Sequence, residues 1–131
     1  MNGFLLDASL LIAMCDPDHV HHGLAEAWML PVGSFAVCPI VEGALVRYYL
    51  RAGAEREVIG AILREIANRS GYHHWPDSVP YRDVDLSRVR GHRQVTDAYL
   101  VALTRAHPGW QLATLDRGLA DAHPDVVHLV C

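Results

Sequence analysis

The stretch Phe4-Leu5-Leu6-Asp7-Ala8-Ser9, near the start of the chain, is an apolar run that ends at an acidic residue. A short continuous apolar run is typical of a strand buried on both faces, as in a parallel sheet. Asp7 and Ser9 can then cap a short helix that we expect over residues 10–13. A strand that leads directly into a helix is the repeating unit of α/β proteins.

The rest of the chain continues this alternation. A second helix is expected from about Asp18, with Val20, Leu24, Ala27 and Trp28 on one face. Later helices are expected from Pro39 until Gly53 stops the helix, over 54–69, from Thr96 to Arg105 and around Leu119, with at most one helical turn near 85–89. Further strands are expected at 35–37, 72–75, 110–115 and 126–130, which together predict a parallel α/β sheet.

Composition places limits on the class of protein. The chain has 131 residues, of which 51% are hydrophobic and 20% are charged, so we expect one globular domain over residues 1–131. No apolar run approaches the roughly 20 residues of a membrane span, and no signal peptide is recognisable. The three cysteines form neither a metal-ligand pattern nor a disulfide framework, which favours a cytoplasmic location.

The net charge of −4 argues against a nucleic-acid partner, unless several acids serve bound cations and so reverse the local sign. Four acids have similar positions: Asp7 and Asp116 end strands, while Glu42 and Asp97 open helices. All four are therefore expected at the carboxyl edge of the sheet, where open parallel sheets bind ligands. Each one could instead simply cap a helix.

Two carboxylates roughly 4 Å apart repel by about 4 kcal/mol at an effective dielectric constant of about 20, so such a cluster requires protons or cations. Oxygen-only ligands favour Mg²⁺ or Mn²⁺ over zinc. A divalent ion held in this way can activate water for phosphodiester hydrolysis.

Four segments resemble the motifs of PIN-domain ribonucleases, in particular their VapC toxin branch, and the resemblance covers nearly the whole chain. The segments are Leu5-Leu6-Asp7-Ala8-Ser9, Cys38-Pro39-Ile40-Val41-Glu42, Val95-Thr96-Asp97-Ala98-Tyr99-Leu100 and Ala113-Thr114-Leu115-Asp116-Arg117-Gly118-Leu119.

This resemblance implies a three-layer PIN-like sandwich with a sheet of order 3-2-1-4-5 and helices on both faces. It implies an endoribonuclease dependent on Mg²⁺ or Mn²⁺, inhibited by a VapB-type antitoxin, and it favours a homodimer. The acidic positions carried over as catalytic and metal-binding are Asp7, Glu42, Asp97 and Asp116. Ser9, where many relatives have Asn, and Thr114 match supporting hydroxyl positions.

Arginines near these acids could contact RNA phosphates, or could lie in a solvated loop with structural ion pairs. They are Arg88, Arg90, Arg93 and Arg117. Two other functions are considered: a catalytically silent PIN-like module that binds RNA or protein, and a phosphatase with Asp7 as nucleophile. Such phosphatases usually have a second acid two residues later, where this chain has Ser9.

Three other groups of residues are expected to have structural roles. His73 and His74 beside Trp75 could stack on a base, but a strand end with one buried aromatic is expected. Glu65 is expected to pair with Arg69 along a helix. The polar stretch over residues 16–22 lacks the spacing of a zinc site and is expected to begin a helix.

Overall fold

The computed structural model describes residues 1–131 and contains a five-stranded parallel sheet of order β3-β2-β1-β4-β5. This confirms the sheet order that the family resemblance implies. The strands are β1 (Gly3–Leu6), β2 (Phe35–Val37), β3 (Tyr72–His74), β4 (Trp110–Thr114) and β5 (Val127–Leu129).

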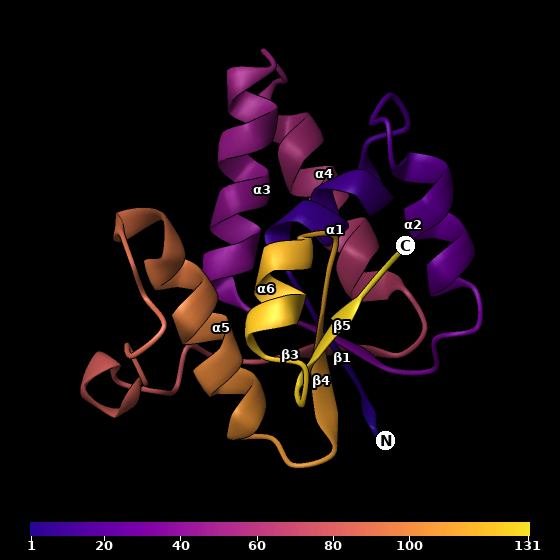
Figure 1. The fold of residues 1–131 in the computed structure, drawn as a ribbon. Coiled ribbons are helices and arrows are strands. Elements are labelled where there is room, and N and C mark those ends of the chain that lie inside the picture. The colour runs from indigo at the N-terminus through magenta and orange to yellow at the C-terminus, as the bar shows by residue number, and fades with distance from the viewer.

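Helices connect the strands and cover the sheet on both faces. In Figure 1, α5, in orange, and α6, in yellow, lie beside each other. α1 contacts α2 and α3, and α3 contacts α4. The helices are α1 (Ala8–Cys15), α2 (His22–Met29), α3 (Pro39–Arg51), α4 (Arg56–Asn68), α5 (Val95–Arg105) and α6 (Arg117–Ala122), with single 3₁₀ turns at Tyr81–Asp83 and His92–Gln94.

The central strand β1 shows why short apolar runs decide this fold. Leu5 and Leu6 point to opposite faces of the sheet, and neither is exposed to solvent. Leu5 lies in register with Ala36 on β2 and Leu112 on β4, which are also fully buried. Burial on both faces explains why β1 carries no polar side chain until the chain leaves the sheet at Asp7.

The second helix begins later than the sequence predicts. α2 starts at His22, and Val20 is 86% exposed instead of facing the core. Asp16 explains the delay, because its carboxylate accepts hydrogen bonds from the backbone N–H of Asp18 and from the Tyr48 hydroxyl, which holds a turn. The buried face of α2 consists of Ala25 and Met29.

One local prediction between residues 65 and 94 is wrong. Arg69 pairs with Glu26 at 3.5 Å and not with Glu65, because α4 ends at Asn68 and Arg69 has extended backbone angles. Residues 85–89 form no helix, as the prediction of at most one helical turn allows: the backbone N–H of Val89 donates to the carbonyl of Leu86 in a single turn, and the 3₁₀ turns lie on either side of it.

The third strand ends on a buried aromatic, as predicted. Trp75 is buried, and its ring stacks on that of His107 with centroids 3.6 Å apart and planes 7° apart. Trp75 is therefore a core residue and is not available to an RNA base. None of the helices combines the length and apolar character needed to cross a membrane.

Candidate functional site

Asp7 occupies the junction between β1 and α1, where it is only 8% exposed. Its Oδ1 accepts a 2.7 Å hydrogen bond from the backbone N–H of Ala8, so Asp7 caps α1. Its Oδ2 accepts hydrogen bonds from the hydroxyls of Thr114, at 2.6 Å, and Ser9, at 3.3 Å. Burial raises the pKa of Asp7, the hydrogen bonds partly offset that effect, and the charge of Asp116 adds to the rise.

Asp116 occupies the equivalent junction between β4 and α6. Its Oδ1 accepts hydrogen bonds from the backbone N–H groups of Gly118, at 2.9 Å, and Leu119, at 3.3 Å, so it caps α6. Because β4 is adjacent to β1 in the sheet, Asp116 and Asp7 leave the sheet at the same edge.

Asp97 joins these two acids from the first turn of α5. It is half-buried, and no side chain caps α5, so this carboxylate is not a cap. Burial, followed by the charges of Asp7 and Asp116, raises the pKa of Asp97 to about 6. The three aspartates therefore interact electrostatically as one cluster.

Glu42 lies in the first turn of α3 and is also half-buried. Its charge is not among those that raise the pKa of Asp97, whereas it does raise the pKa of Tyr72, for which burial is the larger cause. The structure thus brings together three of the four predicted acids, whereas Glu42 lies on α3 and is not part of this electrostatic cluster.

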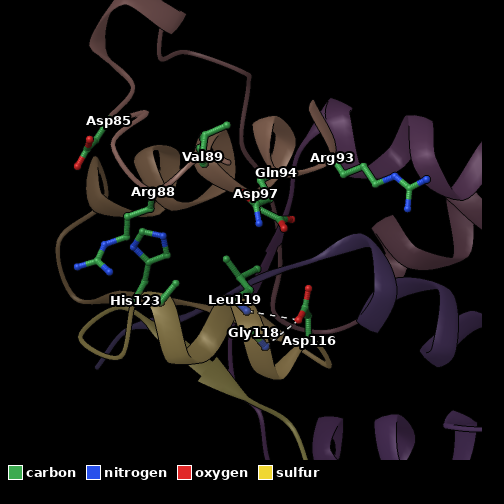
Figure 2. Close-up of a pocket in the computed structure, with 12 residues that line it drawn as sticks. Asp85, Arg88, Val89, Arg93, Gln94, Asp97, Asp116, Gly118, Leu119 and His123 are labelled. Atoms are coloured by element: carbon green, nitrogen blue, oxygen red, sulfur yellow. Dashed lines mark hydrogen bonds between the residues drawn. The ribbon is translucent and has the colours of Figure 1, made fainter. Parts of the chain in front are cut away.

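A pocket of about 320 Å³ extends from the aspartates between α5 and α6. In Figure 2, Asp97 and Asp116 lie at one end, and the side chains of Arg88 and His123 lie side by side at the other. His123 has no counterpart among the predicted site residues. It follows the last helical residue of α6, shortly after the fourth acidic motif ends at Leu119, and the fold places it with Arg88 in the lining of the pocket.

Curated proteins with similar sequences are ribonucleases named VapC. No protein-family model matches the chain. It is 44% identical over 127 residues to Ribonuclease VapC29 of Mycobacterium tuberculosis, covering 96% of this chain and 95% of that protein. It is 36% identical over 128 residues to Ribonuclease VapC39 of the same organism, covering 90% and 91%, and 38% identical over 125 residues to Ribonuclease VapC44, covering 88% and 87%.

The chain belongs to the VapC ribonuclease family. Its parallel sheet and flanking helices are consistent with the PIN-like fold expected for VapC proteins. The interpretation of the acids as simple caps holds in part for this VapC chain: Asp7 and Asp116 do cap helices, whereas Asp97 and Glu42 do not.

The four arginines considered from the sequence differ in position. Arg88 and Arg93 both line the pocket, Arg88 at the end that holds His123. Arg117 is exposed immediately after Asp116. Arg90 is exposed on the loop before α5, where its backbone N–H donates to the Gln94 side chain.

The donor chemistry of the VapC site fits a hard divalent cation, because the cluster offers only carboxylate oxygens and carries mutually repelling charge. No three His, Cys, Asp or Glu side chains are arranged closely enough to hold an ion as they stand.

Proposed function

We propose that this chain is the toxin of a VapBC-type pair, an endoribonuclease that hydrolyses RNA phosphodiester bonds with Mg²⁺ or Mn²⁺. The observation that carries the proposal is the cluster of Asp7, Asp97 and Asp116 at the carboxyl edge of the sheet, in a chain of the VapC family. These three aspartates, with Glu42, would hold the ion.

Different residues of the chain would have different roles in such a reaction. Asp7 is fixed by the hydroxyls of Thr114 and Ser9 and by its own helix cap, so its position is set before any ligand binds. Asp97 is not engaged as a cap and can turn its oxygens toward a cation. The bound ion would lower the pKa of a water molecule and neutralise charge on the phosphate.

Arginines would hold the RNA chain against this acidic edge. Arg88 and Arg93 line the pocket, and Arg117 and Arg90 lie exposed on either side, so all four are candidates for contact with phosphates. In hydrolysis the water oxygen bonds to phosphorus, the phosphorus–oxygen ester bond breaks, and the leaving oxygen takes a proton. The arginines position the strand and take no part in those bond changes.

An unregulated ribonuclease would damage its own cell, so we also propose a VapB-type antitoxin as partner. An acidic cluster is complemented by a cation, and a guanidinium binds carboxylates in bidentate fashion. We expect the antitoxin to insert an arginine among the acids and an apolar segment nearby. A homodimer acting in the cytoplasm is part of the same proposal.

The test is RNA cleavage by purified chain free of any partner. We expect cuts in a mixed RNA pool with Mg²⁺ or Mn²⁺, none in EDTA, and none with Asp97→Asn. Asp121→Asn, an exposed aspartate on α6 outside the pocket, is the matched control and should cleave like the parent.

Full activity of metal-free protein in excess chelator would reject the metal mechanism. Parental cleavage by Asp97→Asn would reject the site. A parent chain that binds RNA but never cuts it, with metal present, would support the silent binding module instead.

A further inference from the structure

The pocket beside the aspartates continues beyond them along α5 and α6. A second cavity, of about 460 Å³, adjoins it. The two share a common wall, so together they form one groove that starts at the acids. The shared residues are Asp85, Arg88, Ala98, Ala122 and His123.

The first part of this groove has an apolar floor between two polar ends. Val89, Ala98, Leu119 and Ala122 supply the apolar surface. Its volume of about 320 Å³ lies within the range of roughly 300–1,000 Å³ that is typical of small-ligand pockets. A pocket of that volume with an apolar patch among polar residues, next to the acidic edge, is suited to a nucleobase and its sugar.

The far end of the pocket offers an unpaired cation. The ion pairs of the structure are Arg69–Glu26 and Arg105–Asp125, so the guanidinium of Arg88 makes no direct ion pair. Its charge does interact with Asp85, whose pKa is lowered first by hydrogen bonds from Ser87 and further by Arg88. His123 lies beside Arg88, and the charges of Arg105 and Arg88, after burial, lower its pKa. Asp85 lies on the rim, where its Oδ1 accepts a hydrogen bond from the backbone N–H of Ser87.

The geometry points to a one-nucleotide subsite in this pocket, and this inference rests on the proposed ribonuclease function. The phosphate to be cut lies at Asp97 and Asp116, the neighbouring nucleoside covers the floor formed with Leu119, and the next phosphate meets Arg88 and His123. The alternation of apolar and cationic surface matches the alternation of base and phosphate along a single strand. The subsite would set base preference at one position next to the cleaved bond.

Filling the pocket tests the subsite directly. Ala122 is half-buried on α6 and lines both cavities, so Ala122→Leu places a larger side chain on the floor. We expect its KM for RNA to rise about tenfold, the loss of one good contact, and the base preference next to the cut to weaken in sequenced RNA ends. Mn²⁺ affinity by calorimetry should be unchanged. Ala27→Leu, exposed on α2, is the matched control.

A second variant tests the cationic end without touching the fold. Arg88 is exposed on a loop, so Arg88→Ala should melt like the parent. In an Asp97→Asn background, which keeps RNA intact, Arg88→Ala should reduce the slope of log affinity against log salt by about 0.7 for single-stranded RNA. Arg56→Ala, exposed on α4, should not change the slope.

Three results separate the outcomes. If the parent cuts RNA but Ala122→Leu matches Ala27→Leu in KM and cut pattern, and Arg88→Ala keeps the parental slope, the subsite is wrong while the ribonuclease stands. If Ala122→Leu cleaves normally but escapes inhibition by its antitoxin, the pocket belongs to the antitoxin and the subsite is again wrong. If the parent cuts no RNA, it is the proposed function that fails.

Discussion

The Thr114 hydroxyl donates a 2.6 Å hydrogen bond to Oδ2 of Asp7, joining residues 107 positions apart in the chain. The hydroxyl oxygen of Thr114 in turn accepts a 3.0 Å hydrogen bond from the backbone N–H of Asp116. One buried hydroxyl thus links two of the candidate catalytic acids across adjacent strands β1 and β4. The contact fixes the distance between the two strand ends on which the site depends.

Replacing Thr114 by valine should therefore weaken both fold and site. Valine keeps the shape but leaves the N–H of Asp116 and Oδ2 of Asp7 short of a partner, which costs about 1–3 kcal/mol for such buried groups. Urea denaturation measures the loss, and RNA cleavage should fall as well. Thr114→Ser retains the hydroxyl and should stay near the parent; equal stability of the valine and serine variants would contradict this role.

The pKa of Asp97 predicts a pH effect on the metal-free protein. Its value of about 6, against an ordinary 3.8, means that the folded chain holds a proton that the unfolded chain has released. The free energy of unfolding contributed by this group therefore falls as pH rises from about 4 to about 6 and stays lower above.

Asp97→Asn removes this titration, so it should be more stable than the parent at pH 7. We expect a difference of about 1 kcal/mol, since solvent screens a half-exposed carboxylate. The advantage should shrink as pH falls toward 4, measured by urea unfolding at several pH values in EDTA. A difference that does not change with pH would show that the carboxylate is not strained.

Divalent ions should reverse that relation. Because an ion bound to the folded state stabilises it, Mn²⁺ should raise the Tm of the parent at pH 7 and leave Asp97→Asn nearly unchanged. Asp121→Asn should respond like the parent. Equal Tm shifts for all three proteins would place the ion elsewhere.

Two glycines provide a matched test of local packing. Gly53 and Gly71 both have positive φ, 86° and 87°, but a Cβ on Gly53 meets open space, whereas one on Gly71 would lie 2.0 Å from the carbonyl oxygen of Gly33. Gly53→Ala should lower the free energy of unfolding by about 1–2 kcal/mol, the cost of holding alanine in a left-handed backbone conformation. Gly71→Ala should cost clearly more, because β3 would have to move from β2; thermal unfolding of the pair checks this, and equal losses would contradict it.

The antitoxin proposal has its own test. Changing the inserted arginine of the antitoxin to glutamate should restore RNA cleavage in the mixture, because glutamate would face carboxylates of like charge. A complex in which Asp7, Asp97 and Asp116 stay open to solvent while inhibition is complete would contradict insertion.

The sequence is most informative where local chemistry and tertiary position agree. The apolar run from Phe4 to Leu6 predicts a buried strand, and Asp7 then has to leave the sheet at its carboxyl edge. The strand, the helix cap and the position of the acid can therefore be predicted together. Local sequence predicts the start of α2 too early, because the turn before it is stabilised by a distant contact. The Asp16 side chain accepts a hydrogen bond from Tyr48 on α3, 32 residues away.

The extent of the site was harder to predict than its centre. Acidic motifs identify Asp97 and Asp116, but His123 carries no signal of its own, since one histidine after a short helix has no distinctive spacing. The Arg69 ion pair was similarly missed because it depends on where α4 ends. Contacts between elements that are distant in sequence require the packing itself.

Asp7 and Asp97 differ in how far the fold relies on them, and a genetic selection should reveal it. Asp7 is buried and accepts three hydrogen bonds, so substitutions there should deplete the folded protein itself. Asp97 is no cap, so substitutions there should leave an inert but folded chain. Among cells that survive expression of the toxin, Asp7 alleles should be recessive, because they lower the amount of folded protein. Asp97 alleles should instead leave folded protein that no longer cleaves RNA.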